Sequence, residues 1–147
     1  DPQKAPIVGA LCFGTDEGLL FPTLYDMVQE EGAEPHMVRY NTWAPNAMFQ
    51  VVATGAACLL VHRSVLAAMR EKYPEPYVWF QEVNFGGQPM GEDITFCLRA
   101  GLLGYPVYVN TGVEIGHAKT SILTADMYAK QRRLMELEAA DGASQPG

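Results

Sequence analysis

The chain has 147 residues, of which 48% are hydrophobic and 18% are charged. This composition is typical of one globular domain and excludes disorder or a coiled coil as a description of the whole chain. Ten basic residues against seventeen acidic ones give a net charge of −7, which argues against nucleic acid as a partner. The sequence contains no run of about 18 apolar residues, so we expect no membrane span.

The start of the chain and its cysteines carry further expectations. Residues 1–4 contain neither an initiator Met nor the basic-then-apolar order of a signal peptide, so we interpret this end as a cut edge. Cys12, Cys58 and Cys97 are odd in number and each lies in an apolar run, which predicts three buried, reduced thiols. Reduced thiols and the missing signal peptide favour a cytoplasmic location.

The first part of the chain predicts strands around one short helix. Residues 7–13 are a continuous apolar run of the kind found in a strand buried on both faces. Between residues 21 and 32 three apolar side chains have helical spacing, so we predict a short helix that ends at Gly32. Residues 49–61 predict one or two strands that pivot at Gly55.

The middle of the chain predicts a helix and an aromatic strand. Ser64 can cap a helix that continues to about Tyr73, where two prolines follow. Residues 77–80 predict a short aromatic strand, and residues 81–90 a loop.

The last part predicts two helices around a pair of strands. The clearest helix covers residues 91–103, because its apolar residues recur at helical spacing. Residues 106–110 and 113–117 predict two strands, and Thr124 can cap a terminal helix to about residue 140. The alternation of strands and helices predicts an α/β domain with a mixed sheet and flanking helices, and we expect residues 141–147 to be a frayed tail.

Glu92 and Asp93 are the first candidates for chemistry. They fall in the first turn of the predicted 91–103 helix, where the helix dipole stabilises ionised carboxylates and keeps them usable as bases. Neighbouring helical residues diverge by about 100° around the axis, so only one of the two can face a given cleft. The alternative is that both are ordinary first-turn carboxylates.

His117 is the second candidate. It follows a strand-like run and a glycine, so its imidazole could project from the end of a sheet and bind a divalent metal. A lone histidine is also common in purely structural roles. Familiar hydrolase, zinc-protease and phosphate-loop motifs are absent from the sequence.

An aromatic loop is the third candidate. Trp79 and Phe85 flank the loop that contains Gly86 and Gly87, whose paired glycines permit motion. Aromatic faces are suitable platforms for sugar rings, although packing in the core or at its edge is the alternative for Trp79.

Four segments together resemble a known family. Residues 55–65, 91–100 and 104–109 and the pair Gly116-His117 resemble the C-terminal half of a family 2 glycosyltransferase with the GT-A fold, in their order and spacing. The resemblance covers about residues 7–128, and residues 7–13 are similar to the strand that follows the metal-binding Asp-x-Asp segment of that family.

The resemblance implies a partial GT-A (Rossmann-like) fold in which residues 1–140 form the acceptor-side catalytic half. It implies transfer of a sugar from a nucleotide-sugar donor to the hydroxyl of a carbohydrate or other acceptor. Asp93 would be the base, and His117 would help to hold Mn or Mg on the diphosphate. Glu92 and the loop would shape the acceptor side; the loop residues are Trp79, Phe85, Gly86, Gly87 and Gly91.

The sequence also departs from the family pattern, because it has no Asp-x-Asp motif and no nucleotide-binding half. We therefore expect a fragment that is inactive alone and that forms homo-oligomers through exposed sheet edges. If the complete enzyme retains anomeric configuration, Asp93 would contact the acceptor without acting as a base. A non-catalytic carbohydrate-binding or interaction module on the same half-fold is the alternative function.

Overall fold

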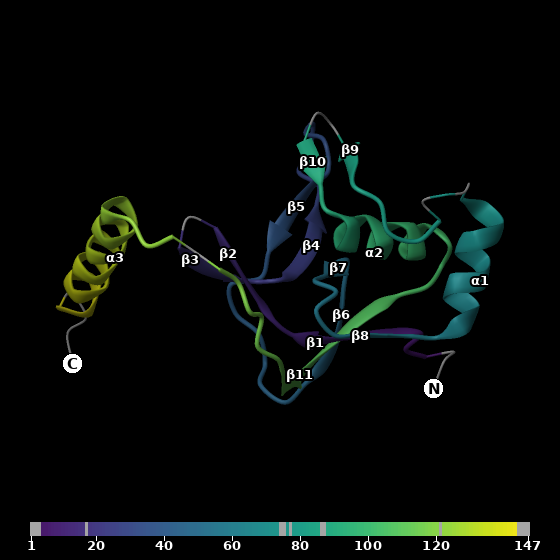
Figure 1. The fold of residues 1–147 in the computed structure, drawn as a ribbon, viewed down its shortest axis with the longest axis horizontal. Helices are drawn as coiled ribbons and strands as arrows, with labels where there is room; N and C mark the ends of the chain where they lie inside the picture. The colour runs from purple at the N-terminus through teal and green to yellow at the C-terminus, as the bar shows by residue number, and fades with distance from the viewer. Residues whose placement is uncertain are drawn as a thin grey trace.

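The computed structural model describes residues 4–16, 18–73, 76, 78–85, 88–120 and 122–143. These residues form a mixed α/β structure (Figure 1). The strands are β1 (Ile7–Leu11), β2 (Phe13–Asp16), β3 (Leu19–Pro22), β4 (Leu24–Val28), β5 (His36–Arg39), β6 (Met48–Val51), β7 (Ala53–Thr54), β8 (Leu59–Val61), β9 (Val83–Phe85), β10 (Gln88–Met90) and β11 (Val107–Glu114). The helices are α1 (Arg63–Lys72), α2 (Glu92–Leu102) and α3 (Ala125–Ala143).

The centre of the fold is a four-stranded mixed sheet in the order β6-β11-β1-β8. β1 and β11 are parallel, and the edge strands β8 and β6 are antiparallel to their neighbours. The side chains of Ile7 and Val109 are fully buried, as expected for central strands with apolar sequences. This confirms the predicted mixed sheet, while Leu60 on the edge strand β8 is 74% exposed.

Three smaller antiparallel groups extend from this sheet: β2-β3, β5-β4-β7 and β9-β10. The predicted helix that ends at Gly32 is wrong, because Leu24–Val28 forms strand β4. Tyr25 pairs with Arg39 of β5 in the register, and Leu24 pairs with Thr54 of β7. A short apolar run fits either periodicity, and here pairing with strands on both sides decides in favour of a strand.

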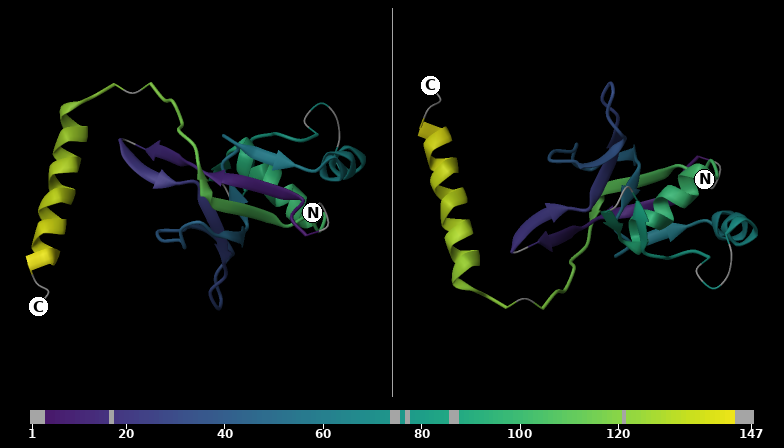
Figure 2. Two further views of the ribbon diagram at one scale, coloured as in Figure 1. Left: turned by 90° about the horizontal axis from the view of Figure 1, so that it is seen from below. Right: turned by 90° about the horizontal axis from the view of Figure 1, so that it is seen from above.

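α2 lies over one face of the sheet, α1 lies beside α2 at one end of the body, and α3 covers neither face (Figures 1 and 2). α2 matches the predicted 91–103 helix and buries Phe96, Cys97 and Ala100 in the core. α3 stands apart from the body, and Thr124 caps it by accepting a hydrogen bond of 3.3 Å from the backbone N–H of Met127, as predicted. Of the helices described, none is long and apolar enough to cross a membrane.

Further details of the sequence prediction are corrected. His62, not Ser64, caps α1, because its Nδ1 accepts a hydrogen bond of 3.3 Å from the Ser64 N–H. The predicted strands 106–110 and 113–117 are one strand, β11, which ends at Glu114. β6 and β1 both pair with its first half, residues 107–110, and Leu11 of β1 pairs with Glu114 after a register shift.

Two other expectations also fail. Residues 78–80 form no strand in the described part of the 77–80 segment. Cys58 is exposed, because it lies in the turn that leads into edge strand β8, while Cys12 and Cys97 are buried as predicted.

Candidate active site

Asp93 is held at the start of the best-packed helix. It is half-buried in the first turn of α2, and its Oδ1 accepts a hydrogen bond of 2.8 Å from the backbone N–H of Ile94. Ile94 packs against the core, so the residue next to Asp93 is anchored. One carboxylate oxygen of Asp93 is therefore tied to the backbone of its own helix.

The residues before Asp93 differ in their roles. Gly91 is the N-cap in extended conformation, and a Cβ added there would lie only 3.1 Å from Oδ1 of Asp93. A glycine thus leaves room for this carboxylate position. Glu92 is exposed, in keeping with the divergence of neighbouring helical side chains.

A cleft of about 990 Å³ opens beside Asp93, between the β4-β5 hairpin and the junction of β10 with α2. Gly91 and Ile94, which bracket Asp93 in the sequence, both line it, whereas Asp93 itself is not among the lining residues. Its other lining residues include Tyr25, Met27, Glu34, His36, Met37, Arg39 and Met90. The volume is within the range of small-molecule sites, and the lining mixes apolar side chains with polar and charged ones.

Tyr25 and Arg39 form the polar wall of this cleft. Burial raises the pKa of the Tyr25 phenol, and the negative charge of Asp93 adds to this, while a hydrogen bond and the charge of Arg39 act in the opposite direction. Tyr25 therefore keeps its proton at neutral pH. The same effects show that Tyr25 lies within electrostatic reach of both Asp93 and Arg39.

His117 is exposed and lies three residues beyond the end of β11. Its Nδ1 is 3.3 Å from the backbone carbonyl oxygen of Phe13 on β2. Since a carbonyl can only accept, this contact favours the tautomer with the proton on Nδ1 and the lone pair on Nε2. That lone pair could serve a metal or accept a proton.

The described residues do not form a metal site around His117. Within the described residues, no three His, Cys, Asp or Glu side chains gather closely enough to hold an ion. Among the described residues, His117 is therefore a candidate ligand without a second or third ligand gathered beside it.

The predicted aromatic loop is only partly described. Trp79 is half-buried, and its indole N–H donates a hydrogen bond of 3.1 Å to the carbonyl of Leu66 on α1, so it packs toward α1 and is not among the lining residues of the cleft. Gly86 and Gly87, and the side chain of Phe85, lie outside the described residues. The predicted 81–90 loop is wrong in part, because Val83–Phe85 and Gln88–Met90 pair as the antiparallel strands β9 and β10, and β10 leads to Gly91.

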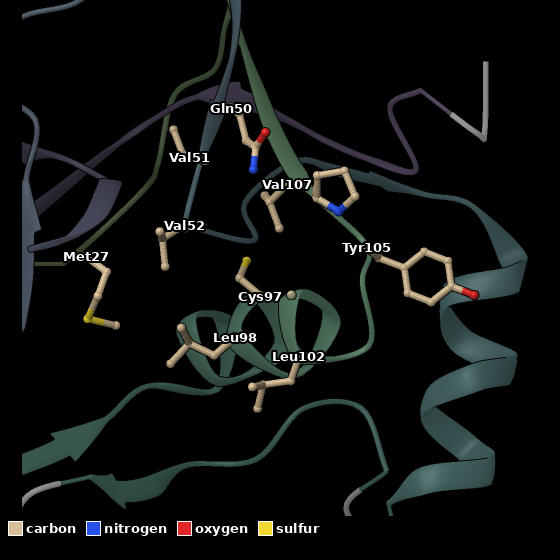
Figure 3. A pocket seen from close by; sticks show the side chains of 11 residues that line it. Met27, Gln50, Val51, Val52, Cys97, Leu98, Leu102, Tyr105 and Val107 are labelled. Atoms are coloured by element: carbon tan, nitrogen blue, oxygen red, sulfur yellow. The ribbon is translucent and has the colours of Figure 1, made fainter. Parts of the chain in front are cut away.

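A second, smaller cleft of about 350 Å³ is almost wholly apolar (Figure 3). Cys97, Leu98 and Leu102 of α2 line one side of it, and Val51 and Val107 line the opposite side. Burial raises the pKa of the Cys97 thiol to about 11, with a smaller contribution from the charge of Asp93, so this thiol is not a nucleophile at neutral pH.

Sequence reasoning missed Tyr25 and Arg39. The signal was present in the alternation of Tyr25 and Met27 and in the turn around Gly32, which has a φ of 80° and joins two strands. A helix over residues 21–32 would not place Tyr25 opposite Arg39, whereas the strand β4 does.

No family model, no curated protein and no solved structure matches this chain.

Proposed function

We propose that this chain is the acceptor-side half of a glycosyltransferase, in which Asp93 takes the proton of the acceptor hydroxyl. The observation that carries the proposal is the position of Asp93, half-buried at a helix start between two residues that line a cleft of about 990 Å³. The resemblance of residues 55–65, 91–100 and 104–109 to family 2 glycosyltransferases supports the choice of reaction.

The geometry suits a general base. A sugar hydroxyl is a weak nucleophile until a positioned group takes its proton, and such a base contributes typically 10²- to 10⁴-fold in rate. Oδ1 of Asp93 is fixed by the Ile94 N–H, and the N-terminal end of α2 stabilises the ionised carboxylate. An acceptor in the cleft would approach Asp93 from the edge that Gly91 and Ile94 line, with Met27, Met37 and Met90 on the walls around it.

The donor side of the proposal requires more than these residues. A nucleotide-sugar would supply the sugar, and Mn or Mg would neutralise its diphosphate when bound. His117 would contribute one imidazole ligand through Nε2, and the other ligands must come from groups besides those described. If the reaction retains configuration, Asp93 orients the acceptor and takes no proton.

The test is nucleotide release from a panel of nucleotide-sugars with Mn or Mg, in the longest natural form of the protein that contains this chain. Asp93→Asn keeps size but cannot take a proton, so we expect turnover to fall by at least about 10²-fold. Glu92→Gln is the matched control, and its effect should be smaller because Glu92 is exposed. Normal turnover in Asp93→Asn would eliminate the base.

The second candidate is a carbohydrate-binding module without catalysis. The open cleft beside Asp93, with its methionine walls, favours it equally well as a binding site. Saturable sugar binding without nucleotide release from any donor would select the module over the enzyme.

A further inference from the structure

The side chain of Arg39 is held in one position on the wall of the cleft. Its guanidinium carbon lies 3.8 Å from the centre of the Phe21 ring, and its strand partner across β4-β5 is Tyr25. Phe21 in turn lies on the backbone of Gly14, where an added Cβ would be 2.6 Å from the ring. A flexible cation is thus fixed by an aromatic face beneath it and a phenol beside it.

This arrangement leaves hydrogen-bond donors available. Stacking on Phe21 occupies a face of the guanidinium, whereas its N–H groups point outward from its edge. One interaction is with Tyr25, and within the described residues no carboxylate forms an ion pair with Arg39. The exposed cation therefore lines the cleft with donors suited to a planar or tetrahedral oxyanion.

The surrounding charges limit where an anion can bind. Glu34 also lines the cleft, and Asp93 lies beside it, so both carboxylates repel an anion from the rest of the cavity. His36 lines the β5 side of the same wall and can add a donor. Attraction is strong only within direct hydrogen-bonding distance of the guanidinium, which suits one anionic group and not several.

We propose that Arg39 binds an anionic group of the cleft's ligand, through paired hydrogen bonds from its guanidinium edge to phosphate or carboxylate oxygens. The nature of that ligand rests on the proposed function. In a sugar transfer the group has two possible sources, the diphosphate of the donor or an acidic group on the acceptor. Both present the same paired oxygens, and two probes separate them.

The position of Arg39 relative to His117 supports a role for Arg39 near the reacting groups. His117 contacts the carbonyl of Phe13, the next residue Gly14 supports Phe21, and Phe21 carries Arg39. Tyr25 then connects Arg39 to the electrostatic surroundings of Asp93. A row of contacts therefore joins the imidazole of His117 to the guanidinium of Arg39, and the charge of the candidate base Asp93 acts on the neighbouring Tyr25.

The experiment is calorimetric titration of the 147-residue chain with inorganic pyrophosphate and, separately, with glucuronate, in metal-free buffer at low salt. Passage of the protein over a chelating resin first removes any metal that could mediate binding at His117. Arg39→Lys keeps the charge but loses the paired donors, and we expect its affinity for the bound probe to fall at least about 10-fold. Arg39→Ala should abolish binding, while Arg132→Ala on α3 is the matched control and should bind as the parent does.

The outcomes separate the sources. Binding of pyrophosphate alone assigns the site to the donor diphosphate, and binding of glucuronate alone assigns it to an acidic acceptor. Binding of both, lost in Arg39→Ala, supports the shared oxyanion site. Binding of neither probe, or equal binding by Arg39→Ala with an unchanged amide NMR spectrum, would overturn the proposal.

A second variant tests the orientation of the Arg39 guanidinium without changing its charge. Phe21→Leu removes the aromatic face but keeps Arg39, so it should weaken probe binding through loss of the fixed orientation. Asp93→Asn should retain anion binding, even where nucleotide release is lost. A failed anion site therefore leaves the proposal for Asp93 intact, and a failed base leaves the anion site intact.

Discussion

α2 and α3 are both helices that the sequence predicts, yet they are stabilised differently. α2 buries Phe96 completely beneath the sheet. α3 leaves Leu134, Met135 and Leu137 exposed by 44%, 57% and 63%, and it stands apart from the body (Figure 2). Packing against the sheet therefore stabilises α2, whereas α3 depends on local interactions along its own length.

The local interactions of α3 are of the weak kind. Thr124 supplies a side-chain cap, and Arg132 pairs with Glu136 one turn later at 2.7 Å. Exposed pairs of this type contribute only about 0.3 to 0.5 kcal/mol. The candidate base Asp93 is on the packed helix, so its position is fixed by the core. A helical pattern in the sequence therefore does not show which helix packs well enough to position a catalytic group.

The largest expected effect contrasts one core side chain on α2 with one surface side chain on α3. Phe96→Ala removes a fully buried ring and should lower the free energy of unfolding by about 3 to 5 kcal/mol. Leu134→Ala removes an exposed side chain and should change it by no more than about 0.5 kcal/mol. Urea unfolding followed by tryptophan fluorescence measures both. Similar losses in the two variants would mean that α3 packs on the body in solution.

The second expected effect is a pH dependence of the free energy of unfolding, caused by the buried Cys97 thiol on α2. Burial raises the pKa of the Cys97 thiol to about 11, against 9.0 for an ordinary cysteine. Between these values the folded state keeps a proton that the unfolded state loses. The free energy of unfolding therefore decreases as pH rises from about 9 to about 11, by roughly 2 to 3 kcal/mol.

Cys97→Ala isolates this contribution. Tyr25 and Tyr40 also have raised pKa values because of burial, and they titrate in both proteins. The difference between the parent and Cys97→Ala across pH 9 to 11 should therefore report the thiol alone. Parallel curves for the two proteins would contradict the burial effect.

The same contrast explains what could be predicted from the sequence. The 91–103 helix and the terminal helix were predicted to within a few residues, because caps and helical periodicity are local signals. β4 was not, since Leu24–Val28 is short and its partners β5 and β7 lie farther along the chain. Strand pairing is decided by tertiary structure, and local spacing does not show it.

The candidate site follows the same division. Asp93 could be proposed from its place at a helix start, and the structure locates Gly91 and Ile94 on the cleft beside it. Arg39 could not be proposed from the sequence. Its proposed anion-binding role depends on Phe21 and Tyr25, which lie beside it only when β3, β4 and β5 have folded together. The sequence around an arginine does not show that an aromatic ring will pack against its guanidinium.

The third effect tests the local character of α3. Thr124→Ala removes the cap on the N–H of Met127 and should cost about 1 kcal/mol of helix stability. Because α3 has little support from packing, this loss should appear as reduced helicity of residues 125–137 in amide NMR shifts. The amide signals of α2 and the β strands should not change. Global destabilisation instead would show that the cap supports the body.

The smallest expected effect is removal of α3 itself, in a variant that ends at Thr124. A contact from the helix to the body is visible at Gly18, where an added Cβ would lie 2.5 Å from the Met127 side chain. Gly18 is at the tip of the β2-β3 hairpin with a φ of 84°, well away from the Phe96 core. Removal should therefore change the unfolding free energy of the body by less than about 0.5 kcal/mol. Urea unfolding with the same fluorescence readout measures it, with Met127→Ala in the intact chain as the matched control for the contact. A loss comparable to that of Phe96→Ala would mean that α3 belongs to the core, and the contrast between the two helices would then be wrong.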